Sequence, residues 1–168
     1  MSEDDRFVLM AKYNHWMNRS IYKACGSLTE HELRLDRGAF FHSIFHTLNH
    51  IVYGDLAFMS RFTGDPAEVP ELGEELADNY ADLAAKRERL DVRILEWTSE
   101  LDPEWLASEL TYQSKVDGRY RTVPQWVLVT HMFNHQTHHR GQVTTLLSQL
   151  DIDFGSTDIP FMPDFMAD

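Results

Sequence analysis

The sequence predicts an all-α protein, a four-helix bundle with a small β-hairpin before the last long helix. Apolar residues recur at three- and four-residue steps in four long segments, which is the spacing of amphipathic helices. Asp117-Gly118 lies between two short alternating, β-prone runs within residues 109–123, which indicates a hairpin. The 168 residues contain no internal repeat, low-complexity tract or linker, so we expect a single domain over residues 1–168.

The first long helix is expected from Asp4 to about Cys25, with Gly26 as its stop. Thr29 and Glu32 have the spacing of a capping box, in which the two side chains satisfy each other's backbone N–H groups. A short helix is therefore expected before the chain reaches residue 38.

The second and third long helices are expected over residues 39–62 and 71–99, separated by a loop at 63–70 that contains one glycine and two prolines. Asp102-Pro103 predicts a short turn of helix, because proline is favoured at the first helical position. The fourth long helix is expected from Pro124 to about Leu150, followed by an extended tail packed on the surface. The bundle is either up-down or built with a long crossover.

Charge and composition narrow the classes of function. Fifteen basic and 27 acidic residues give a net charge of −12, and no basic stripe is present for binding a nucleic acid backbone or an acidic membrane. The longest apolar runs are far shorter than the ~20 residues of a membrane span. The acidic N-terminus has no signal-peptide pattern, and Cys25 is the single cysteine. We therefore expect a cytoplasmic protein without disulfides, nucleic acid partners or membrane partners.

Histidine is the unusual residue of this sequence. Seven of the nine histidines fall in the windows 42–50 and 131–139, and six of these are spaced four residues apart in two sets: His42, His46 and His50, and His131, His135 and His139. Residues four apart on a helix lie on one face with Cβ atoms roughly 5–6 Å apart, so two imidazoles can bind one ion. Each histidine alone is more often an ordinary hydrogen-bonded residue than a ligand, the reading we give to His15 and His31. Two such sets on two helices favour a metal site.

The last long helix carries a second indication. Residues 134–142 contain no apolar side chain, although apolar residues dominate the segments before and after them. A bundle helix that loses its apolar face must leave that stretch in water or place it around a polar site. A metal cavity in the bundle interior satisfies this requirement. Sequence signatures of zincins, ferritin-like di-iron sites, serine hydrolases and nucleotide-binding loops are absent.

Three segments resemble the DinB/YfiT-like metal-binding superfamily, and specifically its damage-inducible DinB branch. They are Asn134–Gln142, Ser43–His50 with the following Asp55 and Arg61-Phe-Thr-Gly64, and Tyr13–Asn18. The resemblance runs across nearly the whole chain and includes the Asp-Gly hairpin. The "damage-inducible" label describes expression, and the charge of −12 argues against a direct DNA role.

This resemblance implies a four-helix bundle that binds one divalent metal, zinc or nickel, through His50, His135 and His139. The other clustered histidines occupy positions that are not the usual ligands, namely His42, His46, His131 and His138. Some relatives transfer low-molecular-weight thiols or run thiol-dependent isomerisations, and many have no known activity. The resemblance also points to a homodimer, which is the commonest assembly of such bundles.

Two hypotheses on function follow. In the first, the three histidines leave a coordination position open, and a metal-bound thiolate or hydroxide attacks a small electrophilic substrate, as in a thiol transferase or hydrolase. Arg140 is then a candidate for binding an anionic group, and Asp55 or Asn49 for orienting a ligand. The alternatives are a salt bridge for Arg140 and helix-packing hydrogen bonds for Asp55 and Asn49. In the second, the protein is a non-catalytic, metal-stabilised dimeric bundle acting in stress response or as an interaction module.

Overall fold

The structure is a computed structural model that describes residues 3–65, 70–71, 73–114 and 117–166. The centre of the expected 63–70 loop lies outside the described residues. Four long helices and one antiparallel hairpin confirm the predicted fold class. They are α1 (Glu3–Cys25), α3 (Ile44–Thr63), α4 (Tyr80–Ser99), α6 (Gln125–Ser148), β1 (Glu109–Gln113) and β2 (Tyr120–Pro124).

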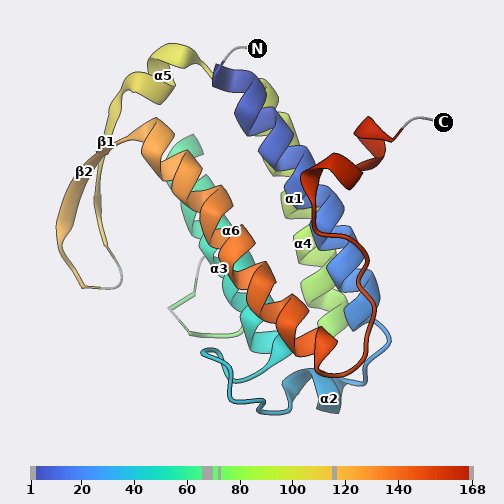
Figure 1. The fold of residues 1–168 in the computed structure, drawn as a ribbon. Helices are drawn as coiled ribbons and strands as arrows, with labels where there is room; N and C mark the ends of the chain where they lie inside the picture. Colours follow the sequence, from blue (N-terminus) through green and yellow to red (C-terminus); the bar gives the residue numbers. More distant parts are fainter. Residues whose placement is uncertain (1–2, 66–69, 72, 115–116, 167–168) are drawn as a thin grey trace.

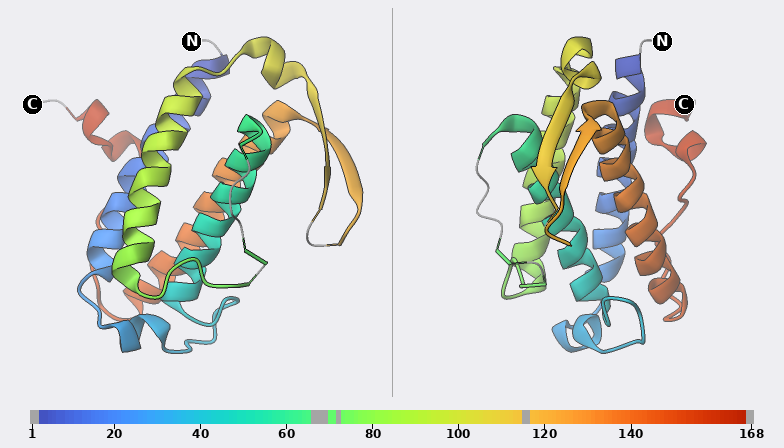
Figure 2. Two further views of the ribbon diagram at one scale, coloured as in Figure 1. Left: turned by 180° about the vertical axis from the view of Figure 1, so that it is seen from behind. Right: turned by 90° about the vertical axis from the view of Figure 1, so that its left-hand side faces the viewer.

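The four long helices form two packed pairs, α1 with α4 and α3 with α6 (Figure 1). α1 and α6 run in one direction, whereas α3 and α4 run in the other, so the bundle has the long-crossover topology. The described residues 73–79 of the crossover lie beside α3, where the Asn49 side chain bonds to the backbone of Glu74 and Leu76 (Figure 2). The hairpin also projects on the side of α3 and α6, while the C-terminal segment lies against α1. The hairpin and the described part of the crossover therefore both lie beside the α3/α6 pair.

Two helices begin later than the sequence predicts. α3 begins at Ile44 and not at residue 39, because the Ser43 side chain accepts a hydrogen bond from the His46 backbone N–H and caps the helix. His42 precedes this cap with a φ of 65°, which an α-helix does not permit, so the expected three-histidine face of this helix loses one member. α4 begins at Tyr80 and not at residue 71, because Asn79 caps it by accepting from the Asp82 N–H.

The shorter elements follow their local signals. The Thr29–Glu32 capping box is formed at the start of α2 (Glu30–Arg34), and Asp102 caps α5 (Pro103–Ala107) with proline in its first turn. In the hairpin, Leu110 pairs with Val123 and the turn contains Gly118 at a φ of 69°. The tail packs on the surface as expected, and it lies against α1, where the Tyr13 hydroxyl donates to the Thr157 carbonyl. The tail also forms two 3₁₀ turns, η1 (Ile159–Phe161) and η2 (Pro163–Phe165).

The bundle interior combines an apolar core with a buried ionic network. The apolar core is built from all four long helices and includes Met17, Ile21, Phe45, Ile94 and Met132. Within it, the Arg87 guanidinium pairs with Asp55 at 2.5 Å and with Asp91 at 2.8 Å, and all three side chains are buried. Among the described residues, none of the helices combines the length and the apolar character needed to cross a lipid bilayer.

Candidate metal centre

Three histidines from two helices meet on the outer side of the α3/α6 pair. His50 comes from α3, and His135 and His139 come from successive turns of α6. The Nε2 atoms of His50 and His135 are 3.0 Å apart, and one donor atom from each of the three rings lies within 4.8 Å of the others. The antiparallel packing of α3 on α6 thus brings together the three residues that the resemblance singled out.

Neighbouring side chains hold two of the three rings. The Nδ1 atom of His139 lies 2.8 Å from the Gln142 side-chain oxygen, so an Nδ1–H donor there leaves Nε2 free to coordinate an ion. The Phe41 ring stacks on His50 with ring centroids 3.9 Å apart. The Nδ1 atom of His135 is buried without a hydrogen-bond partner among the described residues, so packing and not a hydrogen bond orients this ring.

Gly54 provides the space that the His135 ring occupies. A Cβ atom at position 54 would lie 2.8 Å from Cε1 and 3.3 Å from Nδ1 of His135, well inside ordinary van der Waals distance. Any larger residue at position 54 would therefore displace the ring. Sequence analysis missed Gly54, although a glycine one turn after His50, inside an apolar helix, is a detectable signal because it costs helix stability.

All three histidines are held in the neutral form. Burial lowers the pKa of His50 to about 4, with a further contribution from His139. Burial also lowers the pKa of His135 to about 3, helped by the neighbouring histidines. The pKa of His139 is lowered by burial as well, against the effect of its bond to Gln142. Neutral imidazole is the form that binds a metal, so these rings are ready to coordinate one at pH 7.

The donor set fits a divalent transition metal. Two nitrogens 3.0 Å apart can both lie about 2.1 Å from one ion. Three imidazoles suit zinc, nickel, copper or iron better than magnesium or calcium, which prefer oxygen ligands. Within the described residues the cluster contains no fourth histidine, cysteine or carboxylate, which leaves room for an exogenous ligand.

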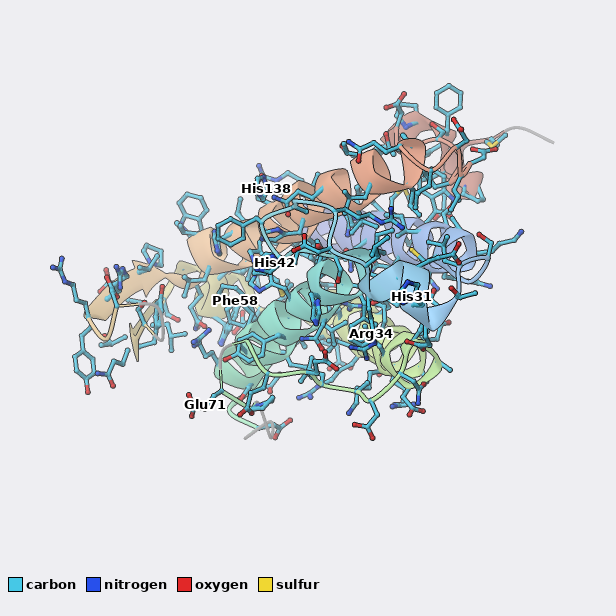
Figure 3. All side chains as sticks on the ribbon, turned by 90° about the horizontal axis from the view of Figure 1, so that it is seen from below. His31, Arg34, His42, Phe58, Glu71 and His138 are labelled. Atoms are coloured by element: carbon cyan, nitrogen blue, oxygen red, sulfur yellow. The ribbon has the colours of Figure 1, made fainter. Side chains whose placement is uncertain are left out.

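The remaining histidines have other surroundings. The two ring nitrogens of His46 are engaged by the Ser43 hydroxyl at 2.8 Å and by Glu75 at 2.9 Å. His42 and His131 are exposed at the rim of the site, and His138 lies at the outer edge of α6 (Figure 3). His15 lies 3.9 Å from Asp91 and His31 is exposed on α2.

Ser43, His46 and Glu75 are connected as a catalytic serine triad would be, but their geometry opposes that role. The Ser43 side chain is buried, and its oxygen already caps α3 by accepting from the His46 N–H. It also contacts Nδ1 of the imidazole, whereas in the serine triad the nucleophile contacts Nε2. These three residues therefore fix the start of α3.

Arg140, Asp55 and Asn49 each have a partner of their own. Arg140 is buried and donates to the side-chain oxygens of Asn14 on α1 and Thr137 on α6, away from the histidine cluster. Asp55 is bound to Arg87 in the interior. Asn49 lines the site, and its amide accepts from the Leu76 N–H and donates to the Glu74 carbonyl, which ties the crossover to α3.

The polar stretch of α6 is therefore divided between two environments. His135 and His139 face the site, whereas Gln136 and Arg140 face the buried network of the bundle. The metal-ligand candidates sit beside the bundle interior and not within it, which differs from the expectation of a central cavity. One residue along a helix is a rotation of about 100°, so adjacent residues can serve different faces.

A pocket of about 910 Å³ opens directly from the three histidines. Its walls come from the loop before α3, from α3 and α6, from the crossover and from β1. Aromatic rings dominate these walls, namely Phe40, Phe41, Tyr53, Phe58 and Tyr112. Sequence analysis did not predict this pocket, because its walls come from segments that are far apart in the chain.

Comparison with known proteins agrees with this architecture. The model of the DinB family matches residues 1–166. The chain is also similar to Protein DinB of Bacillus subtilis (strain 168), with 28% identity over 153 residues, covering 88% of this chain and 87% of that protein. The match extends over the two helices that carry the histidine cluster and over the hairpin, and the chain belongs to the DinB family.

Proposed function

We propose that this protein binds one divalent metal ion, zinc or nickel, through His50, His135 and His139, and catalyses transfer of a low-molecular-weight thiol to a small electrophilic substrate. The observation that carries this proposal is the position of three neutral imidazoles at the base of a 910 Å³ pocket. Catalytic metal sites keep an open position, and structural ones are closed by a fourth protein ligand.

The residues of the chain prepare the site for this chemistry. Burial keeps the three rings deprotonated, Gln142 orients His139, and the absence of a side chain at Gly54 lets His135 approach His50. The aromatic walls reduce the access of water to the reacting atoms. A divalent ion bound there would supply Lewis acidity, which lowers the pKa of a thiol or of water in its open position.

A thiol suits this pocket better than water as the nucleophile. No aspartate or glutamate is among the described residues that line the pocket, so a carboxylate base for activating water is not present there. A free thiol has a pKa of about 8.5, compared with about 15.7 for water, and needs far less assistance to ionise. In the transfer, the sulfur bonds to the electrophilic carbon, the leaving group departs with its electron pair, and the thiol proton passes to solvent.

The experiment is metal analysis followed by a transfer assay. Metal content of the purified protein is measured, and a panel of small thiols is then incubated with a chromogenic aryl halide, with the metal present and after chelation. We expect one equivalent of metal and metal-dependent conjugation, lost in His135→Ala and retained in His138→Ala, which changes an exposed histidine of the same helix. Full metal binding without conjugation of any thiol would favour the non-catalytic, metal-stabilised bundle.

A further inference from the structure

The pocket beside the histidines has an uneven charge distribution. Six of the residues that line it are histidines, and Arg61 is the only lysine or arginine among its described lining residues. No acidic residue is found in that described lining, although the chain as a whole has 27. The Glu75 carboxylate, which contacts the lining residue His46, is also paired with Arg34. A pocket without acidic groups in a strongly acidic protein favours an anionic ligand.

Arg61 differs from the paired arginines of this protein. Its guanidinium lies 5.5 Å from the Phe58 ring centroid and 5.1 Å from the Tyr112 ring centroid, between α3 and β1. In the part of the chain that the structure describes, no carboxylate contacts it. Other arginines have such partners: Arg34 with Glu75, Arg93 with Asp65, and Arg121 with Asp117. The planar donors of Arg61 are therefore available to a ligand, and the two rings hold the guanidinium at the pocket wall.

The position of Arg61 along α3 sets the length of that ligand. His50, Gly54, Phe58 and Arg61 follow one another at four-, four- and three-residue steps, so they share one face of the helix. α3 advances about 16 Å between His50 and Arg61. A ligand that reaches from the histidines to the guanidinium is thus elongated, and its middle lies beside aromatic rings. The Phe40 ring, 79% exposed at the mouth, offers further apolar surface.

We propose that Arg61 binds the carboxylate of an elongated, apolar small molecule whose other end reaches the three histidines. This inference rests on the proposed function, since it names the substrate class of the same pocket. The carboxylate can belong to the thiol donor or to the electrophilic acceptor, because the charge and length requirements are the same for the two molecules.

The test compares ligand pairs that differ only in charge. Binding of phenylbutyrate and its neutral amide is measured by calorimetry on the full-length protein after chelation, so that the carboxylate cannot bind a metal. Mercaptooctanoate and mercaptooctanol are compared on the zinc-loaded protein. We expect the charged member to bind about tenfold more tightly in at least one pair, as a charge-assisted, bidentate contact implies. Preference in the first pair identifies the acceptor as the carboxylate carrier, and preference in the second identifies the thiol.

The variants Arg61→Gln, Arg61→Lys and Arg89→Gln separate specific binding from general effects. Arg89 is an exposed residue of α4 that does not line the pocket. Arg89→Gln therefore changes the net charge by the same amount as Arg61→Gln without changing the pocket. Arg61→Gln should remove the preference for the carboxylate and leave binding of the neutral partner unchanged, whereas Arg61→Lys should keep part of it and Arg89→Gln all of it. If Arg61 only holds the hairpin in place, Arg61→Gln should weaken the binding of the charged and the neutral ligand equally, and this result would overturn the proposal.

Metal content is measured separately on every variant. One equivalent of zinc in Arg61→Gln shows that a lost preference does not come from a lost metal. If the wild-type protein binds no metal, the proposed function fails, while the phenylbutyrate pair still tests Arg61. Equal affinity of the wild-type protein for the charged and neutral members of both pairs, or an undiminished preference in Arg61→Gln, would refute the carboxylate assignment.

Discussion

Replacing Gly54 by alanine should change the metal affinity of the site and leave the stability of the metal-free protein nearly unchanged. The added Cβ would lie 2.8 Å from Cε1 of His135, about 0.6 Å or more inside an ordinary contact. The atom in its way is the end of a side chain, so the ring can rotate aside at a cost of roughly 0.5–1.5 kcal/mol. Alanine in place of an interior helical glycine stabilises the helix by about 1 kcal/mol. The metal-free protein should therefore keep its stability to within about 1 kcal/mol.

Metal affinity should respond differently. Rotating His135 away removes one of three ligands from its place, which we expect to weaken zinc or nickel binding by at least the 10–100-fold typical of a disturbed ligand environment. Calorimetric titration with each metal gives the affinity, and thermal unfolding in the presence of a chelator gives the stability. A loss of affinity without a loss of stability would identify Gly54 as a determinant of the site.

Gly141→Ala is the matched control. Gly141 also lies inside a helix, two residues after His139, but a Cβ atom there would have no neighbour within 4 Å. The substitution should give the same gain in helix propensity and leave metal affinity unchanged. Unchanged affinity in Gly54→Ala as well would refute the reasoning, because it would mean that the observed position of His135 is not needed for binding.

Four further predictions concern the ligands, the pH dependence of metal affinity and of stability, and the assembly. His135→Ala and His139→Ala should abolish stoichiometric metal binding, measured by metal analysis after dialysis, whereas His31→Ala should retain it. Because burial lowers the pKa of all three histidines, to about 4 for His50 and about 3 for His135, metal affinity should weaken by less than tenfold from pH 7 to 6 and fall steeply below about pH 4.5, as followed by competition with a chromophoric chelator. A tenfold weakening between pH 7 and 6 would contradict these shifts. Unfolded histidines protonate near pH 6.5, so the metal-free protein should lose stability as pH falls from about 6.5 toward 4. Light scattering should give a homodimer with twice the chain mass of 19.6 kDa, and a monomer at micromolar concentration would argue against this assembly.

The fold could be predicted because its signals are local. Helical periodicity, the Thr29–Glu32 box and the Asp-Gly turn each depend on residues a few positions apart. The two misplaced helix starts show the limit of this method. The helical spacing of apolar residues extends to positions before Ser43 and, through Leu76, to positions before Asn79. The helices nevertheless begin only after Ser43 and Asn79, because these two polar side chains cap their N-termini. Phe41 leaves the helix and stacks on His50, where it lines the pocket.

The site could be predicted only in part. The four-residue spacing places His135 and His139 on one face, but it cannot choose between His46 and His50 as the ligand from α3. That choice depends on tertiary contacts, since Ser43 and Glu75 engage His46 and the packing on α6 brings His50 to His135. The role of Gly54 and the aromatic pocket likewise arise where separate segments meet. For Arg140 the alternative to ligand binding was a salt bridge, whereas in the structure its guanidinium donates to the Asn14 amide oxygen on α1 and not to a carboxylate.

The position of the histidine cluster depends on the buried ionic network behind it. Asp55 follows Gly54 on α3, and Arg140 follows His139 on α6, so each interior residue is one position from a residue of the site. Arg87 pairs with Asp55 and Asp91, while Asn14 contacts Asp91 and Arg140, which connects all four long helices. Moving one buried partner would leave a charge uncompensated in an apolar environment, so the network permits one arrangement of the helices. We infer that Asp55 and Arg140 contribute to the site by fixing α3 against α6, and hence the 3.0 Å between His50 and His135.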